Sequence, residues 1–174
     1  MATTRQPTDI EFELSAVLGQ EATKVLDPAV ARAWIALLTA YGRVTRALSS
    51  ELMDASGMSL ADFDVLAQLA RREGYALRMS ELAEAVLISK SGLTRRIDRL
   101  AVNGWVTRRR CTEDGRVHWA TLTPLGLRTF KAVAPAHLAA VAERFGGALP
   151  ISEMGRLTRD LLKIAAKNEE PSRA

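Results

Sequence analysis

Short hydroxyl side chains and long basic side chains follow one another closely between residues 89 and 99. A hydroxyl can donate and accept hydrogen bonds, and an arginine can grip two acceptors at once on a phosphate or on the edge of a guanine base. This set of side chains therefore suits recognition of nucleic acid rather than the making or breaking of bonds. The candidate contact residues are Ser89, Lys90, Ser91, Thr94, Arg95 and Arg99.

A second basic stretch follows, in which Arg108–Arg110 precede a short polar segment and Arg116 comes after it. The β-rich residues on either side predict a hairpin. Neighbouring residues of a strand point to opposite faces of the sheet. Arg109, a further candidate contact, is therefore expected on the face opposite to that of Arg108 and Arg110. An arginine at a hairpin tip can enter a narrow minor groove of DNA, which makes Arg116 a candidate. Asp114 can brace Arg116 by a charge pair, unless the two form only a surface ion pair.

Helical spacing predicts the element that positions the first set. Leu93, Ile97 and Leu100 share one face, so residues 90–102 are expected to form a helix that turns its hydroxyl and basic side chains outward. Ser89 is the expected N-cap of this helix. By itself, such a helix is interpreted equally well as the solvated basic face of a core helix.

A shorter helix is expected just before, with Ser80 as its N-cap and its end near Val86. Two helices followed by a hairpin form a helix-turn-helix with a wing. The helix 90–102 would then enter the major groove and the wing, residues 107–122, the minor groove. The basic hairpin behind the basic helix favours this interpretation.

Long apolar helices flank this unit. Asp27 and Pro28 mark the N-cap and first residue of a helix that runs to about Ala55. At 1.5 Å per residue it would be about 42 Å long, so part of it is expected to meet a partner chain, the alternative being an ordinary core helix. After the hairpin, Thr123 and Pro124 begin another long helix, and a last apolar helix follows.

The charge is concentrated in the candidate contact region. The 174-residue chain has a net charge of +4, and residues 89–116 hold eight cationic and three anionic side chains. A basic patch within one motif favours a nucleic-acid partner. The single cysteine excludes an internal disulfide. No apolar run is long enough to cross a bilayer, and no secretory leader is visible, so a cytoplasmic protein without a membrane partner is expected.

Enzyme chemistry has little support in the sequence. Besides His137, the chain has only Cys111 and His118, which could face each other across the hairpin. A solvated hairpin offers no oxyanion site, and two such groups are too few for an all-protein zinc site. Neither a glycine-rich phosphate loop nor a zinc-binding histidine pair on a helix is present. We therefore expect no enzyme activity, no metal and no cofactor.

Several short motifs combine in this region: Leu82-Ala83, Ser91, Leu93-Thr94-Arg95, Ile97-Asp98-Arg99-Leu100, Gly104-Trp105-Val106, Arg108, Asp114, Arg116, Leu122-Thr123 and Gly126. Together they resemble the MarR (multiple antibiotic resistance regulator) family of winged helix-turn-helix transcription factors, over about residues 28–166. The resemblance implies a mainly α fold, in which a winged helix-turn-helix DNA-binding lobe is joined to a dimerisation lobe made of N- and C-terminal helices.

The resemblance also implies a division of the chain and a function. The segments are 1–27, an extension that can hold a short helix; 28–56, a dimerisation helix; 57–123, the DNA-binding lobe; 124–168, C-terminal dimerisation helices; and 169–174, a tail. The implied function is a homodimeric repressor that binds double-stranded DNA at a near-palindromic operator and is released by a small-molecule effector. The alternative is a winged-helix module used for protein–protein contacts without sequence-specific DNA binding.

By match to the family, Ser91, Thr94 and Arg95 fall at base-reading positions, Arg116 at the wing-tip arginine and Asp114 at the bracing acid. Where the family often has Asp-Arg-Arg at the tip, Gly115 replaces the first arginine, which removes one DNA contact. Cys111 lies in the wing, where its thiol is either redox-sensitive among basic neighbours or an incidental small residue.

The resemblance also implies an effector, because small aromatic or phenolic acids often bind between the dimer helices and the DNA-binding lobe in this family. Plain core packing explains each candidate wall residue at least as well, so no effector site is assigned. The candidate walls are Trp34, Tyr41, Phe63, Leu66 and Arg78.

Overall fold

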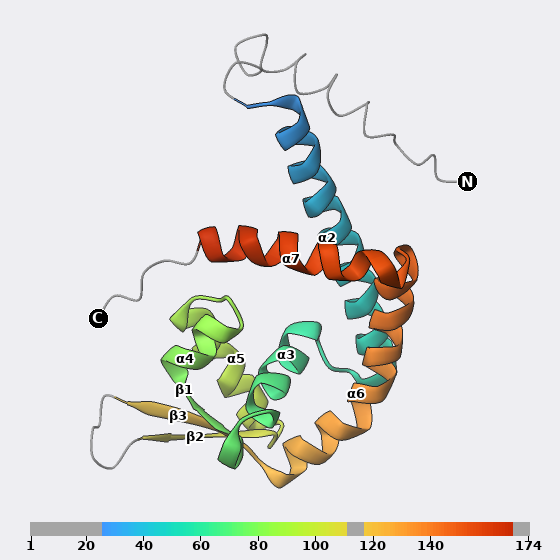
Figure 1. The fold of residues 1–174 in the computed structure, drawn as a ribbon. Coiled ribbons are helices and arrows are strands. Elements are labelled where there is room, and N and C mark those ends of the chain that lie inside the picture. The colour runs from blue at the N-terminus through green and yellow to red at the C-terminus, as the bar shows by residue number, and fades with distance from the viewer. Residues whose placement is uncertain (1–25, 111–116, 169–174) are drawn as a thin grey trace. The chain divides into compact units, whose positions relative to one another are not determined.

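The computed structural model describes residues 26–110 and 117–168 (Figure 1). The chain divides into two compact units, residues 1–47 and 48–174, which are considered separately. The elements in chain order are α2 (Pro28–Ser56), α3 (Leu60–Ala70), the 3-10 turn η1 (Glu73–Tyr75), β1 (Ala76–Arg78), α4 (Met79–Ala85), α5 (Lys90–Val102), β2 (Val106–Arg110), β3 (His118–Leu122), α6 (Pro124–Arg144), the 3-10 turn η2 (Gly146–Ala148) and α7 (Ile151–Lys167). This composition confirms the mainly α fold class.

The long first helix begins and ends where the sequence predicts. The Asp27 carboxylate accepts a hydrogen bond from the backbone N–H of Ala29 at 2.7 Å and so caps α2. After Ser56 the chain turns at Gly57, whose φ of +67° lies in the left-handed region that glycine adopts without strain. The end of α2, from Leu48 to Ser56, belongs to the second unit, where Leu48 and Leu52 are buried.

Helices α3, α4 and α5 pack with the sheet around one apolar core. The three inward-facing residues predicted for α5, Leu93, Ile97 and Leu100, are fully buried, as are Leu66 of α3 and Leu82 of α4. Because α4 and α5 are joined by a short turn and followed directly by the β2–β3 hairpin, the helix-turn-helix and its wing are confirmed. In Figure 1, β2 and β3 extend together away from the helices.

The sheet is antiparallel with strand order β1-β3-β2. Its core face carries Leu77 opposite Ala120 and Val106 opposite Leu122. Its other face carries a row in which Trp119 lies between two arginines from the neighbouring strands. The sheet therefore buries one face against the helices and offers the other to solvent.

The predicted cap of α4 is wrong. Arg78 is the N-cap, because β1 runs directly into the helix, and Ser80 lies within the first turn. The backbone N–H of Arg78 donates to the Glu81 carboxylate at 3.4 Å. A capping serine is a local signal, and here the pairing of β1 with β3 sets the start of the helix two residues earlier.

The start of α6 is fixed by Thr123, as the sequence predicts. The Thr123 hydroxyl accepts from the N–H of Gly126 at 2.9 Å and donates to the carbonyl of Gly104 at 2.7 Å. This hydroxyl thus caps α6 and joins it to the turn between α5 and β2. Further along α6, the Phe130 ring packs on Phe63 of α3 with 5.2 Å between ring centroids.

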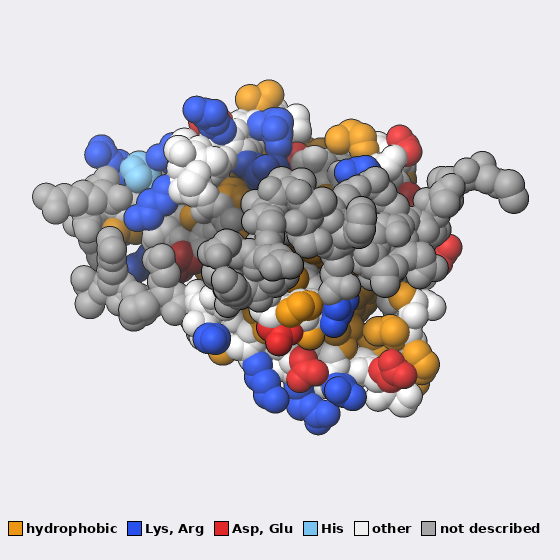
Figure 2. Space-filling view, turned by 90° about the horizontal axis from the view of Figure 1, so that it is seen from above, with side chains coloured by type: hydrophobic (Ala, Val, Ile, Leu, Met, Phe, Trp, Pro, Cys, Tyr) orange, Lys and Arg blue, Asp and Glu red, His pale blue; other side chains and the backbone are white. Residues whose placement is uncertain are grey.

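Both flanking helices carry large apolar side chains that the described chain leaves exposed. In the first unit these are Trp34, Leu38 and Tyr41 of α2, and in the second Leu161, Leu162 and Ile164 of α7. Figure 2 shows apolar side chains at the surface beside charged ones. None of the described helices is long and apolar enough to span a membrane.

Candidate nucleic-acid interface

The N-terminus of α5 presents a cluster of hydroxyls. Ser89 caps the helix, since its hydroxyl accepts from the N–H of Gly92 at 3.1 Å. The hydroxyls of Ser89 and Ser91 lie 3.2 Å apart and form a hydrogen bond. A helix N-terminus carries unpaired N–H groups and a partial positive charge, both of which attract phosphate.

The outward face of α5 carries the predicted reading residues. Lys90, Ser91 and Arg95 are exposed, and Thr94 is half-buried. The Thr94 hydroxyl donates to the carbonyl of Lys90 at 3.0 Å, and its oxygen can still accept a hydrogen bond. A long basic side chain beside short hydroxyl groups offers donors and acceptors of the kind that read base edges in a major groove.

Beneath this face, Asp62 of α3 joins two turns of α5. Its side chain is 9% exposed, and its Oδ1 accepts from Arg96 at 3.0 Å and from Arg99 at 2.5 Å. Because the carboxylate is buried and both partners are cationic, the contact is a charge-assisted link that fixes the rotation of α5 about its own axis. Ser59, the N-cap of α3, accepts from the Asp62 N–H at 3.1 Å, while the Asp62 carboxylate binds the two arginines.

This link changes the place of Arg99 among the candidate contacts. Its guanidinium is held by Asp62 rather than extended from the helix, although its side chain remains 55% exposed. Arg96, on the same flank, is 23% exposed and bound to the same oxygen. The structure therefore brings Ser89, Lys90, Ser91, Thr94 and Arg95 together and gives Arg99 a structural bond.

The hairpin divides its arginines between two faces, as the strand alternation predicts. Arg109 lies opposite Trp119, which lies opposite Arg78, so the three form a row across the outer face of the sheet. The Arg78 guanidinium is 5.6 Å from the centre of the Trp119 ring, a cation–π contact. The tip residues Cys111, Asp114, Gly115 and Arg116 lie outside the described residues.

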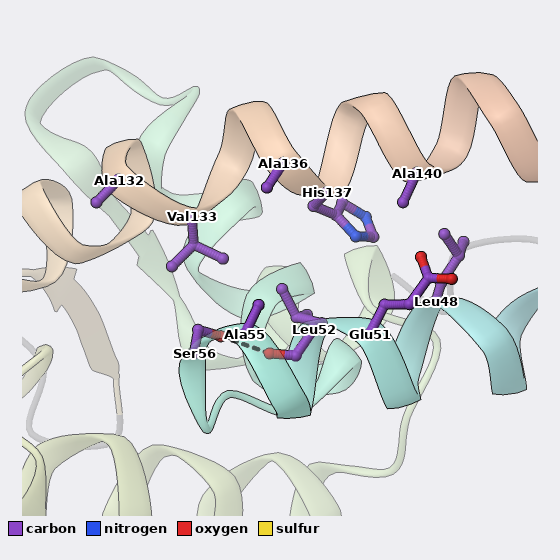
Figure 3. A pocket seen from close by; sticks show the side chains of 10 residues that line it. All are labelled: Leu48, Glu51, Leu52, Ala55, Ser56, Ala132, Val133, Ala136, His137 and Ala140. Atoms are coloured by element: carbon purple, nitrogen blue, oxygen red, sulfur yellow. Dashed lines mark hydrogen bonds between the residues drawn. The ribbon is translucent and has the colours of Figure 1, made fainter.

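A pocket of about 320 Å³ lies between the end of α2 and α6 (Figure 3). Its walls are mostly alanine, leucine and valine side chains, and the His137 ring points from α6 across the pocket toward α2. Burial lowers the pKa of His137 below its usual value, an effect that the nearby Asp64 carboxylate opposes. The same ring packs against Phe63 at a tilt of 52°, with 4.3 Å between centroids. Glu51, on the α2 side, pairs with Arg144.

The residues considered above as walls of an effector site do not line this pocket. Leu66 and Phe63 are buried in the core, and Arg78 lies on Trp119. Trp34 and Tyr41 belong to the first unit, where both are exposed. In the described ranges, no group of three potential ligands is placed to hold a metal ion.

Sequence reasoning missed three features of this region. Asp62 occupies a buried position among the apolar residues of α3, and an acid on an apolar face is a signal that could have found it. The stacking of Arg78 on Trp119 depends on strand pairing, which leaves no local signal. Leu87, in the turn between α4 and α5, is a bulky residue with a φ of +54°.

Comparison with known proteins agrees with this geometry. Residues 56–117 match the MarR family. The fold is similar to Sco3205, a MarR family transcriptional regulator from Streptomyces coelicolor solved in complex with DNA, with 30% identity and a TM-score of 0.78 over 86% of this chain and 93% of that one. The transcriptional regulator PecS of Dickeya dadantii is 37% identical over 82 residues, which span 47% of this chain and about half, 49%, of PecS.

A more distant structure shares the fold. Bordetella bronchiseptica BpsR, whose DNA binding is regulated by 6-hydroxynicotinic acid, is 23% identical and superposes with a TM-score of 0.69 over 77% of this chain and 98% of BpsR. The helix-turn-helix and its hairpin thus belong to a chain that matches a DNA-bound regulator over 86% of its length. The chain belongs to the MarR family of winged helix-turn-helix, DNA-binding transcriptional regulators, which are not enzymes.

Proposed function

We propose that this chain is a homodimeric, cytoplasmic repressor that binds a near-palindromic operator. Each α5 enters a major groove, and each wing reaches the neighbouring minor groove. The observation that carries the proposal is the exposed cluster of hydroxyl and basic side chains in the N-terminal half of α5. Asp62 binds Arg96 and Arg99 of the same helix and so ties α5 to α3. A dimer would place two such helices in successive grooves, about 34 Å apart.

The direct test is a mobility-shift titration of the full chain with duplex DNA from upstream of its own gene. At low salt we expect a retarded band that an excess of unrelated duplex does not remove. Folded dimer that gives no specific band would reject the proposal. Repression is tested by joining the same upstream DNA to a reporter, whose expression should rise when the regulator is deleted.

The wing arginine has a separable effect on salt dependence. Replacing Arg116 by alanine is expected to weaken binding and to reduce the slope of log affinity against log salt by about one, because one cationic side chain no longer neutralises charge on the DNA. Binding is measured by fluorescence anisotropy over a range of salt. The control is Lys131→Ala, at an exposed residue of α6, which should leave the slope unchanged. An unchanged slope for Arg116→Ala would show that the wing is not on DNA.

The exposed apolar side chains of α2 and α7 support the dimer. Sedimentation equilibrium should give about twice the 19.0 kDa chain mass at micromolar concentration. Leu162→Glu, on α7, places a charge in the expected interface and should shift the mass toward one chain, because an unpaired charge is costly to bury. The control is Glu84→Lys, a charge change at an exposed residue of α4 outside the proposed dimerisation helices, which should remain dimeric. A single-chain mass for the wild type would contradict the dimer.

Effector release is supported by the pocket between α2 and α6. At about 320 Å³ it has room for a small aromatic acid, its walls are apolar, and His137 supplies a polar edge. Regulation of BpsR by 6-hydroxynicotinic acid makes that compound and related phenolic acids the first to titrate against the DNA complex. Ala136→Trp fills the pocket, and it should keep DNA binding while abolishing the response to the acid. An unaltered response would place the effector elsewhere.

A further inference from the structure

Leu87 is the most exposed large apolar residue of the described chain, with 91% of its surface open to solvent. It lies in the turn between α4 and α5, and its φ is +54°. Bulky L-residues rarely adopt this left-handed conformation, because Cβ comes too close to the carbonyl oxygen. Leu87 therefore occupies a strained position without burying its side chain.

The fold gives no reason for a leucine here. The neighbours on either side, Val86 and Ile88, pack against the core, whereas Leu87 points away from it. The turn itself is held by backbone bonds, from the N–H of Leu87 to the Glu84 carbonyl at 3.2 Å and from that of Ile88 to the Ala83 carbonyl at 3.1 Å. These bonds do not depend on the side chain at 87.

Elsewhere the chain uses glycine for the same conformation. Gly57, Gly74 and Gly104 all have positive φ, and Tyr75 is the other described exception. Glycine at 87 would relieve the strain and remove an exposed apolar group at once. A strained residue whose side chain serves no packing role is a candidate for a functional contact.

The position of Leu87 shows what that contact would be. It precedes Ser89, the N-cap of α5, by two residues, so their Cα atoms are within about 7 Å of each other. Lys90 and Ser91, which follow, are exposed in the proposed DNA-facing cluster. Leu87 thus borders that cluster on the side where the chain enters the helix.

We propose that Leu87 makes an apolar contact with DNA at the edge of the major groove, beside the polar contacts of α5. The apolar groups available there are the thymine 5-methyl groups and the carbons of deoxyribose. Such a contact adds affinity without neutralising a phosphate, and with thymine it adds sequence preference. The inference rests on the proposed placement of α5 in the groove.

The test measures stability and DNA affinity of Leu87→Gly together. Melting of this variant should occur at the wild-type Tm or up to about 3 °C above it, since relief of the strain offsets the greater freedom of glycine in the unfolded chain. Its affinity for the strongest duplex selected by the wild-type chain from a random pool should fall by about 5- to 20-fold. The slope of log affinity against log salt should stay unchanged, because no phosphate contact is lost.

Two further variants sharpen the result. Leu87→Asn also tolerates the left-handed conformation and should lose affinity as glycine does. Val102→Ala changes an apolar residue that is 88% exposed at the opposite end of α5, and it should bind normally. Replacing thymine by uracil in the duplex should weaken wild-type binding if the contact is with a methyl group and leave it unchanged if the contact is with deoxyribose.

The outcomes separate this inference from the proposed function. If the wild-type chain selects no duplex, the placement of α5 in a groove is wrong. If the wild type binds and Leu87→Gly binds equally well, the apolar contact is wrong while the proposed function stands. A changed salt slope for Leu87→Gly would also overturn it, because the loss would then be electrostatic.

Discussion

Replacing Gly126 by alanine should lower the free energy of unfolding by about 3 kcal/mol and the Tm by about 6 to 12 °C. A Cβ atom at this position would lie 2.1 Å from the carbonyl oxygen of Trp105 and 2.9 Å from Cδ1 of Leu122. The first of these atoms belongs to the backbone and cannot move aside as a side chain does. The start of α6 would therefore have to move away from the turn that precedes β2.

The expected loss of stability is large because the hydrogen bonds of Thr123 depend on the same close approach of α6 to Trp105. Its N–H donates to the Trp105 carbonyl at 2.9 Å, and its hydroxyl donates to Gly104. Displacing α6 would stretch both bonds and uncap the helix. Thermal unfolding followed by circular dichroism measures the effect.

Gly155 provides the matched control. It lies inside α7, and a Cβ built there meets no atom within 4 Å. Alanine is the better helix former, so Gly155→Ala should raise stability by up to about 1 kcal/mol. If Gly126→Ala melts with the wild type, the approach of α6 to the Trp105 carbonyl is looser than the structure shows.

Replacing Asp62 by alanine should destabilise the chain by about 2 kcal/mol. The carboxylate is the shared partner of Arg96 and Arg99, and its loss leaves a half-buried guanidinium without a counter-charge. Breaking a fully buried pair costs about 3–5 kcal/mol, but water reaches both arginines here and reduces the loss. Urea unfolding gives the free energy of unfolding.

The same variant should also weaken DNA binding, because α5 loses the bond that fixes its orientation under the reading face. We expect about a tenfold loss with little change in salt slope, since the carboxylate contacts no phosphate. Arg96→Ala combined with Asp62→Ala should cost less than the sum of the two single changes. Glu84→Ala, an exposed acid on α4, should change stability by less than about 0.5 kcal/mol. Additive losses would show that the two side chains are not coupled.

The elements that local chemistry specifies could be predicted from the sequence. Ser89, Asp27 and Thr123 each bond an N–H two or three residues away, so the starts of α5, α2 and α6 follow from short stretches of chain. The inward row of α5 follows from helical spacing alone, and it is buried as predicted. The outward set on α5 follows from the same periodicity, and its contact with DNA remains a prediction.

The features that could not be predicted from the sequence depend on contacts between residues that are distant along the chain. Asp62 lies 34 residues from Arg96 and 37 from Arg99, and the register that joins Trp119 to Arg78 and Arg109 spans three strands. The need for glycine at 126 arises from a carbonyl 21 residues earlier, at Trp105. The cap of α4 moved from Ser80 to Arg78 because β1 pairs with β3 up to the helix.

The sequence by itself thus determined which helices form, which faces are apolar and where the basic side chains gather, because caps and periodicity act over a few residues. Only the tertiary structure decided that Arg99 is bound to Asp62 while Arg95 is exposed, and that Leu87 is strained and uncovered at the edge of the same surface. Burial, counter-charges and backbone approach are properties of packed elements, and no short stretch of chain contains them.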